Sequence, residues 1–407
     1  MNGAAPLAGI RVADFGHFIA APLCAALLGD MGADVVRVER PGGSEDRAVT
    51  SLFQHADGTP GEGAPFLQHN RNKRSIAVDL AAPEGAEVIR RLILWADIVV
   101  ANFPRAVLEK LGLSFNAIHA VNPRAILVAS SAFGNEGPYV DRVGFDGIAQ
   151  VMCGAAWFAG TPEQPQRSQA MWVDCATGML AAYGAVAALR ARDQTGLGQA
   201  VNTSLLSTAL MVNSSFVMEQ AVTKPNRVPH GNRAHTAGPA DLFRCTDGWI
   251  FLAVQTNAIF RRWARVIGAQ DMLDDPRFLD DAGRGLHGAA LSERMQGWCE
   301  ARSVADVIAL LEEGRVPAGP VYNLDQVLAD PHVIATGAFE PVAFPGIDRP
   351  APVARSPVSL SRFDRGPTRR APLAGENNEE VLAELGFDAT TITEWRARAV
   401  IRSGSSR

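Results

Sequence analysis

The stretch that decides the fold is Gly9-Ile10-Arg11-Val12-Ala13-Asp14-Phe15, followed by an apolar segment over 22–31 and then by Ala33-Asp34-Val35-Val36-Arg37-Val38-Glu39. Both quoted runs predict strands, because they are short and rich in residues that favour extended backbone. The segment between them predicts a helix, since Pro22 suits a first helical turn and Gly32 ends the apolar run. Strand, helix and strand in this order form a βαβ unit with two parallel strands.

The same alternation continues through the first third of the chain. Further strands are predicted over 75–80, 96–103 and 125–133, and helices over 83–95 and 105–111. Repeated βαβ units predict a Rossmann-like, doubly wound parallel sheet, so the fold class is α/β. A chain of 407 residues also indicates about two domains.

The pattern changes near residue 225, where a smaller α+β domain is predicted over 225–325. Its expected elements are a loop at 225–238, a strand at 248–254, helices at 257–267, 291–301 and 304–313, and a strand at 316–322. Ser303 is expected to cap the helix at 304–313. Prolines in the last strand confine it to an edge or a surface.

The rest of the chain is assigned to the large domain. That domain is predicted to cover 1–215 and to be completed by 330–407, with a helix over 378–385. Residues 339–372 are rich in proline and arginine and predict a long extended connector without regular structure. Such a connector usually wraps a surface or a partner subunit.

Composition excludes several functional classes. A net charge of -5 and a pI near 5.9 argue against a general nucleic-acid binder, and no basic run is longer than Arg71-Asn72-Lys73-Arg74. The five cysteines are scattered and lack C-x-x-C spacing, so neither a disulfide framework nor a zinc site is expected. No leader pattern and no uninterrupted apolar 18-mer occur, so we expect a cytoplasmic protein.

The first strand lacks the glycine pattern of a dinucleotide site. Glu39 stands where an acid would bind a ribose, but Gly16-His17-Phe18-Ile19-Ala20-Ala21-Pro22 contains no G-x-G-x-x-G. Its proline falls where backbone amides would hold a pyrophosphate. Phosphate-loop, zinc-protease and hydrolase-elbow motifs are also missing, which argues against those reaction classes.

Asp174 is the most informative single residue. It lies in Met171-Trp172-Val173-Asp174-Cys175-Ala176-Thr177-Gly178, after an expected extended entry over 168–173 and before a helix predicted over 175–190. Asp174 therefore falls at or near the helix N-cap, a position for which aspartate is a preferred residue. The alternative interpretation is a covalent nucleophile, a role that an activated carboxylate can fill.

Short motifs spread over nearly the whole chain give this alternative its context. They are 33–43, 72–76 with 79–80, 97–103, 144–146 with 150 and 154, 173–174 with 177–178, 196–199, 231–233, and 371–373 with 375–376. In this order they resemble the class III coenzyme A transferases, the CaiB/BaiF family. The resemblance implies a Rossmann-like domain built from both chain ends, a small domain, and two subunits interlocked as a homodimer.

The resemblance also implies an activity. Coenzyme A (CoA) would pass from an acyl-CoA donor to a free carboxylic acid, without a metal or a permanently bound cofactor. Asp174 would attack the thioester and form first an acyl-aspartyl mixed anhydride and then an aspartyl-CoA thioester. Backbone amides at the start of the following helix could stabilise the oxyanion.

Further site residues follow from the same resemblance. The expected CoA-binding residues are His17, Phe18, Ile19, Ala20, Arg40, Asn102, Phe103, Lys110, Arg142 and Asp146. Asp146 has a second interpretation as a residue that stabilises a turn. Arg233 and His235 are candidates for holding the second carboxylate of an acid substrate.

Departures from the family pattern limit the choice of substrate. Formyl-CoA transferases have a glutamine at the position of Ile19 and a glycine-rich loop in the small domain, both missing here, so oxalate and formate are disfavoured. Arg233 and His235 favour small dicarboxylates such as succinate. Ile19 and Trp172 leave longer or aromatic acids open.

Two other functions remain open from the sequence. A 2-methylacyl-CoA racemase would move a proton on the α-carbon, and its histidine belongs in a G-H-D motif where this chain has Gly144-Phe145-Asp146. Phe145 cannot accept a proton, which disfavours that reaction. A CoA-binding protein without catalysis is the third hypothesis, and under it Asp174 would only pack against the ligand.

Overall fold

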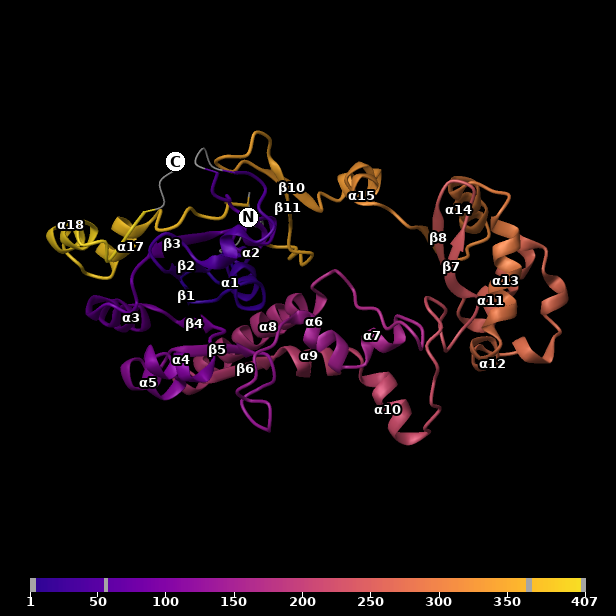
Figure 1. Cartoon of the computed structure of the whole chain (residues 1–407), viewed down its shortest axis with the longest axis horizontal. Coiled ribbons are helices and arrows are strands. Elements are labelled where there is room, and N and C mark those ends of the chain that lie inside the picture. Colours follow the sequence, from indigo (N-terminus) through magenta and orange to yellow (C-terminus); the bar gives the residue numbers. More distant parts are fainter. Residues whose placement is uncertain (1–4, 55–57, 364–367, 404–407) are drawn as a thin grey trace. The chain divides into compact units, whose positions relative to one another are not determined.

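The computed structural model describes residues 5–54, 58–363 and 368–403. By its internal contacts the chain forms two compact units (Figure 1). The first unit comprises Met1–Cys153, Ser168–Ser214 and Ile334–Arg407, and the second comprises Gly154–Arg167 and Ser215–Val333. Each unit has its own sheet and its own buried core.

A six-stranded parallel sheet forms the centre of the first unit and confirms the α/β prediction. Its order is β3-β2-β1-β4-β5-β6, the arrangement of a doubly wound sheet. The strands are β1 (Arg11–Asp14), β2 (Asp34–Glu39), β3 (Lys73–Ala77), β4 (Ile98–Ala101), β5 (Ile126–Ser131) and β6 (Ala200–Ser204). The sequence did not predict β6, whose alternation of small and polar residues is a weak strand signal.

Helices cover both faces of this sheet. Val12 and Ala13 are neighbours on β1 but belong to different core clusters, because successive side chains point to opposite faces. On the face of Val12 lie α1 (Ala20–Asp30) and α8 (Trp172–Thr195). The face of Ala13 is covered by α3 (Pro83–Trp95), α5 (Phe115–Val121), α17 (Asn378–Glu384) and α18 (Ala389–Ala397).

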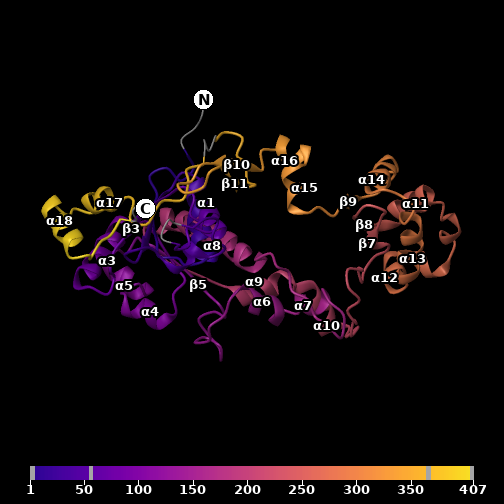
Figure 2. The same cartoon turned by 45° about the horizontal axis from the view of Figure 1, so that its top comes forward.

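The C-terminal segment completes the second of these faces. Leu382 and Trp395 are buried in the same cluster as Val36 and Val99 of the central strands. Figure 2 shows α17 and α18, in yellow, beside β3 and α3. The sequence predicted α17 within one residue but not α18.

Shorter elements complete the first unit. They are η1 (Glu45–Ala48), α2 (Ala64–His69), α4 (Arg105–Lys110), α6 (Asp146–Met152), α9 (Leu205–Val212), β10 (Phe339–Val342) and β11 (Ala351–Ala354). β10 and β11 pair as an antiparallel hairpin, so the prediction of a connector without regular structure over 339–372 is wrong. Prolines obscured these strands, yet Pro341 and Pro352 face each other in a two-stranded sheet that consists only of edge strands.

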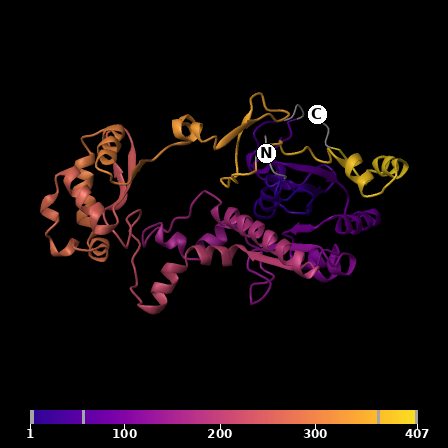
Figure 3. The same ribbon diagram turned by 180° about the vertical axis from the view of Figure 1, so that it is seen from behind.

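The second unit is built on a small antiparallel sheet. Its order is β7-β8-β9, with β7 (Ala240–Arg244), β8 (Trp249–Ala253) and β9 (Ala318–Pro320). β9 pairs only with β8, so the predicted edge strand is confirmed. Helices α11 (Thr256–Ile267) and α13 (Gly288–Cys299) lie on one side of the sheet (Figure 3). The unit's other helices are α7 (Ala155–Phe158), η2 (Gln270–Met272), η3 (Pro276–Phe278), α12 (Asp281–Leu286), α14 (Val304–Glu313) and α15 (Leu324–Ala329). Two helices, α10 (Ser214–Val222) and α16 (Pro331–Ala335), cross its boundary.

Local capping in the second unit follows the sequence. The Ser303 hydroxyl accepts the Asp306 N–H at 3.1 Å, as expected for the start of α14. The loop over 225–238 connects α10 to β7 without regular structure. The sequence missed β7, because its five residues, Ala240–Arg244, give only a weak strand signal.

The long helix α8 differs from its prediction at both ends. It runs over 24 residues from Trp172 to Thr195, whereas 175–190 was predicted. In the described ranges it is the one helix long and apolar enough to cross a membrane. Core helices of soluble domains pass the same test, and α8 packs on α1, β5 and β6. Its apolar composition therefore fits the centre of an α/β unit.

Candidate functional site

The candidate site lies at the carboxyl edge of the parallel sheet, where β1 and β4 are neighbours. The chain leaves β1 for β2 on one side, while β4 lies on the other, so this is the topological switch point of the sheet. Ligands of doubly wound sheets usually bind there. The loop after β1 carries His17 and Phe18, and the loop after β4 carries Asn102 and Phe103.

Asp174 lies in the first turn of α8. The N-cap residue is Met171, so the predicted extended entry over 168–173 is too long and Asp174 is not the cap. The reason is Asp146, whose carboxylate accepts the N–H groups of Val173 at 2.8 Å and Asp174 at 3.0 Å. A residue distant in sequence thus caps the helix.

Asp146 is itself fixed by a buried amide. It is 5% exposed, and Gln150 donates to its second carboxylate oxygen. The same Gln150 accepts the Ser168 N–H at 3.0 Å and donates to the Ala170 carbonyl at 3.2 Å. One turn of α6 therefore holds the whole entry into α8.

The Asp174 side chain has no such partners. Among the described residues, no hydrogen bond or ion pair reaches its carboxylate, which is partly buried. Burial, and then the charge of Asp146, raises the pKa of Asp174 to about 7. A carboxylate that is poorly solvated and unpaired is a stronger nucleophile than one in water.

The amides at the start of α8 do not match the expected oxyanion site. The N–H groups of Val173 and Asp174 bind Asp146, and the Cys175 N–H binds the Met171 carbonyl at 3.1 Å. These three donors are already occupied. The expectation that they would stabilise an oxyanion is therefore wrong.

Close packing brings Asp174 to the loop after β1. A Cβ atom on Gly178 would lie 2.6 Å from the Ala20 carbonyl oxygen, so α8 touches the start of α1 at this point. Both helices run antiparallel to the strands, and Asp174 is one turn nearer the carboxyl edge on the same helix face as Gly178. That edge carries His17 and Phe18.

The backbone of His17 is held from the neighbouring strand. Its N–H donates to Asn102 Oδ1, and its carbonyl accepts from Asn102 Nδ2, both at 2.8 Å. The His17 ring lies 5.0 Å from the Phe103 ring. Burial, and then Arg37, lowers the pKa of His17, so the imidazole is neutral at pH 7.

Phe18 has an unusual backbone conformation. Its φ is +62°, in the left-handed region that non-glycine residues rarely adopt, and its N–H donates to Asp46 Oδ2 at 2.9 Å. Its ring meets Phe145 edge-on, with centroids 5.7 Å apart. Both rings are substantially exposed, whereas Ile19 and Ala20 are buried at the start of α1.

The candidate cations lie on the surface. Arg40 pairs with Glu45 at 3.0 Å, and both side chains are exposed. Lys110 is the exposed last residue of α4. Arg142 is exposed and lies 3.9 Å from the ring centre of Tyr139. No contact joins these three cations to each other, and only Arg40 comes directly after a strand of the sheet.

Arg233 and His235 belong to the loop of the second unit. The His235 ring lies at a tilt against the His230 ring, with centroids 4.1 Å apart, and meets Phe158 edge-on at 5.5 Å. Burial, followed by the charges of His230 and the nearby arginines, lowers the pKa of His235 to about 4. This loop therefore combines a cation, Arg233, with neutral imidazoles.

The basic run 71–74 has a structural role. Arg71 pairs with Asp30 at 2.6 Å, Lys73 with Asp14 at 2.7 Å, and Arg74 with Asp34 at 2.6 Å. These cations are buried, and their charges are directed to carboxylates of the protein. The sequence offered no signal for this, because the partners lie on other elements.

Comparison with known proteins identifies the class. The sequence profile of CoA-transferase family III matches residues 7–378. The chain is 32% identical over 399 residues to the succinyl-CoA–D-citramalate CoA-transferase of Chloroflexus aurantiacus, covering 97% of this chain and 98% of that protein. It is 33% identical over 401 residues to the succinate–glutarate CoA-transferase of Agrobacterium fabrum, covering 96% and 98%.

The fold agrees with this result. The crystal structure of a CaiB/BaiF family protein from Brucella suis matches with a TM-score of 0.81 at 31% identity, over 93% of this chain and 99% of that one. The chain belongs to CoA-transferase family III. It is a transferase, and the resemblance found in its motifs is confirmed.

Proposed function

We propose that this chain transfers CoA from an acyl-CoA donor to a free carboxylic acid, with Asp174 as the covalent nucleophile. The observation that carries the proposal is a partly buried carboxylate whose backbone is fixed by Asp146 and whose oxygens have no partner in the described residues. It lies at the switch point of the sheet, beside the loop that carries His17 and Phe18.

The reaction would proceed by paired acyl exchanges. An Asp174 oxygen attacks the thioester carbonyl, the C–S bond breaks, and CoA departs as a thiolate. The product on the enzyme is an acyl-aspartyl anhydride. The thiolate then attacks the Asp174 carbonyl, which releases the donor acid and forms an aspartyl-CoA thioester. The acceptor carboxylate then attacks the aspartyl-CoA thioester and displaces the thiolate, which gives a second anhydride. The thiolate attacks the acceptor's carbonyl in this anhydride, so the acceptor departs as its CoA thioester and the Asp174 carboxylate is restored. The first intermediate is activated as an anhydride and the second as a thioester at the Asp174 carbonyl, so the energy of the original thioester is kept, provided that water is excluded.

Protonation of Asp174 should control the first step. Only the ionised carboxylate attacks, and with a pKa of about 7 its fraction rises as the pH increases through neutrality. The rate of acylation by free acyl-CoA should therefore increase between pH 6 and pH 8. Asp146 would act as a positioning residue, since it binds the Asp174 N–H and contributes negative charge.

The CoA would bind along the carboxyl edge of the sheet. His17, Phe18, Ile19 and Ala20 would line its entrance, and Asn102 and Phe103 would follow the pantetheine or adenine part. The two hydrogen bonds between Asn102 and the His17 backbone support this assignment, because they join the two loops of the switch point. Arg40, Lys110 and Arg142 are exposed cations that could meet the phosphates.

The acids are proposed to be small dicarboxylates. Arg233 and His235 would hold the second carboxylate, with Arg233 providing the charge. The names of the two curated relatives both include succinate or succinyl-CoA, which supports succinyl-CoA as a donor to test first. Ile19 and Trp172 leave longer or aromatic acceptors open.

The active form is proposed to be a homodimer with interlocked subunits. Exposed apolar side chains gather on three helices of the first unit: Ile148, Val151 and Met152 on α6, Met179, Tyr183 and Val186 on α8, and Leu210, Met211 and Val212 on α9. Apolar surface of this extent usually marks an interface. We further propose a cytoplasmic location and no permanently bound cofactor; the five free cysteines fit a reducing compartment.

A racemase remains the alternative reaction. It would need a base on the opposite side of the α-carbon from Asp174, and Phe145 occupies the position where that histidine is expected. Phe145 instead packs its ring on Phe18. A purely CoA-binding protein is the other alternative, and it would not require the unpaired carboxylate.

The test is to trap the acyl-enzyme. The protein is incubated with a panel of acyl-CoA thioesters, and adducts are sought by intact mass and by hydroxylamine labelling at Asp174. We expect an adduct in the parent protein and none in Asp174→Ala. Transfer by Asp174→Ala at the parent rate would refute the mechanism. Deuterium entering the α-carbon of 2-methylacyl-CoA without an acceptor acid would support the racemase.

A further inference from the structure

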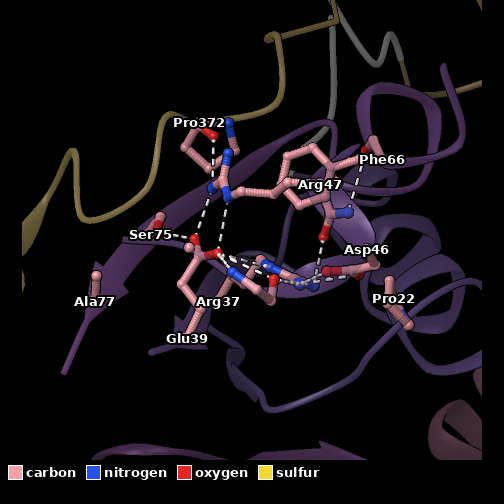
Figure 4. A network of polar contacts seen from close by, with 12 residues as sticks. Pro22, Arg37, Glu39, Asp46, Arg47, Phe66, Ser75, Ala77 and Pro372 are labelled. Carbon is pink, nitrogen blue, oxygen red and sulfur yellow. Dashed lines mark hydrogen bonds and ion pairs between the residues drawn. The ribbon is translucent and has the colours of Figure 1, made fainter. Parts of the chain in front are cut away.

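Buried charged side chains form a network at the first three strands and η1 (Figure 4). Its charged members are Asp14, Arg37, Glu39, Asp46, Arg47 and Lys73, and none is more than 7% exposed. Arg37 donates to both Asp46 oxygens at 3.0 Å, and Arg47 donates to Glu39 at 2.6 and 2.8 Å. The network thus contains two arginine–carboxylate pairs that are joined through Ser44 and by Arg37 Nε, which lies 3.9 Å from a Glu39 oxygen.

One side of this network holds the loop after β1. Asp14 accepts the Gly16 N–H at 2.8 Å, and Arg37 donates to the Gly16 carbonyl at 3.0 Å. Asp46 accepts the Phe18 N–H at 2.9 Å, and Lys73 donates to the Pro22 carbonyl at 2.8 Å. Asn102 binds both backbone groups of His17. Side chains therefore bind the N–H and the carbonyl of Gly16 and of His17, and the N–H of Phe18.

The contact between Asp46 and Phe18 holds the backbone of this loop in an unfavourable conformation. A left-handed conformation at a phenylalanine is unfavourable and persists only when its surroundings impose it. Asp46 imposes it by binding the Phe18 N–H, and Arg37 fixes Asp46 in turn. Without this contact, Phe18 would gain by returning to an ordinary conformation and would carry His17 and Ile19 with it.

We propose that Asp46, held by Arg37, is a positioning residue that fixes the CoA-binding loop in its productive conformation. This inference rests on the proposed function, because it takes the loop over 17–20 as the wall of the CoA site. Asp46 is 3% exposed, and its carboxylate binds Arg37 and the Phe18 N–H, so it is not placed to react with a substrate. Its effect on the reaction passes through the backbone of Phe18.

The first experiment compares the two carboxylates that pair with arginines. Asp46→Asn removes the charge that Arg37 and the Phe18 N–H share, whereas Glu39→Gln makes the same change in the pair that does not touch the loop. We expect Asp46→Asn to weaken CoA binding about tenfold by calorimetric titration, and Glu39→Gln by less than about twofold. Faster deuterium exchange is expected in the peptide spanning 15–22 only for Asp46→Asn.

Kinetics separate positioning from general loosening. For Asp46→Asn, the KM for succinyl-CoA should rise while the KM for the acceptor acid stays at the parent value. A merely structural role would change both constants, or would change the two carboxylate variants equally. Equal weakening of CoA binding in Asp46→Asn and Glu39→Gln would overturn the proposal.

A second, milder pair of variants tests the proposal if Asp46→Asn does not fold. Ser44→Ala and Ser75→Ala each delete a buried hydroxyl that binds Glu39, at 3.1 and 2.7 Å, but only Ser44 also binds Arg37. Ser44→Ala should weaken CoA binding about threefold, and Ser75→Ala should not. Equal CoA affinities for these two variants would also overturn the proposal.

The parent protein separates this inference from the proposed function. If the parent binds CoA but transfers none, the proposed reaction fails while the loop comparison stands. If the parent binds no CoA, both fail. If the parent binds and transfers CoA but the Asp46 and Ser44 variants match their controls, only the positioning role fails.

Discussion

Two groups of carboxylates in the first unit have opposite surroundings. In the network under the loop after β1, Asp14, Glu39 and Asp46 each contact a buried cation. Burial raises the pKa of Glu39, but Arg47 and Arg37 outweigh it and hold that pKa below its usual range. At the start of α8, no cation in the described ranges pairs with Asp174, and burial, followed by the charge of Asp146, raises its pKa to about 7.

The difference separates structural from reactive carboxylates. Aspartate and glutamate are chemically similar, so the neighbouring charge decides which role each takes. A paired carboxylate orders the backbone around it. An unpaired one keeps its lone pairs for a substrate and destabilises the fold at neutral pH.

The largest effect is expected at the unpaired carboxylate. Asp174→Ala should reduce CoA transfer by on the order of 10⁴-fold, because it removes the covalent nucleophile. Initial rates with succinyl-CoA and a free acid would measure this. Asp193→Ala, an exposed carboxylate on the same helix, is the control and should retain parent activity.

A change in the network of paired carboxylates should instead lower the free energy of unfolding. Lys73→Met leaves Asp14 charged and buried, so we expect a loss of about 3–5 kcal/mol in the free energy of unfolding, measured in urea. Arg105→Ala breaks the exposed pair with Glu109 and should leave the stability unchanged. If Lys73→Met were as stable as the parent, the Lys73–Asp14 pair would not hold the strands together.

Removing the charge of Asp174 should raise the free energy of unfolding, the opposite of the effect expected for Lys73→Met. The folded state holds the Asp174 proton up to a pH of about 7, whereas the unfolded chain releases it near pH 3.8, so the parent loses stability as the pH rises between these values. Asp174→Asn should therefore be more stable than the parent at pH 8, by about 2 kcal/mol after allowance for partial exposure. The difference should vanish near pH 4. Asp193→Asn, the same change at an exposed carboxylate of α8, is the control.

The smallest effect concerns the charge of Asp146. Asp146→Asn keeps an oxygen that can accept the Asp174 N–H but removes the negative charge, which is the second cause of the raised pKa of Asp174. The inflection in the pH profile of kcat/KM for acyl-CoA should move to lower pH. Asp141→Asn, an exposed neighbour, should not move it. An unchanged inflection in Asp146→Asn would leave burial as the sole cause.

The sequence predicted elements where the local pattern is strong. The helix over 83–95 has a proline at its start and a clear apolar face, and α3 covers the same residues. The parallel sheet followed from the alternation of strands and helices. β6 and β7 were missed because their short runs lack a strong β signal.

The site was predictable in part. Asp174, His17 and Asn102 were named from motifs, and the structure brings His17 into contact with Asn102. The cap from Asp146 and the hold of Asp46 on Phe18 could not be predicted. Contacts between residues that are 28 positions apart leave no periodic signal, and a buried charge looks like a surface charge in the sequence.

The return of the chain to its first domain has a consequence for synthesis on the ribosome. Leu382, Trp395 and Ile401 fill a core whose strands are made more than two hundred residues earlier. Until residues 378–401 have left the exit tunnel, the part of this apolar face that α17 and α18 cover stays open to solvent and to chaperones, while α3 and α5 can already cover the rest. At about 5–20 residues per second, that exposure lasts tens of seconds for each molecule made.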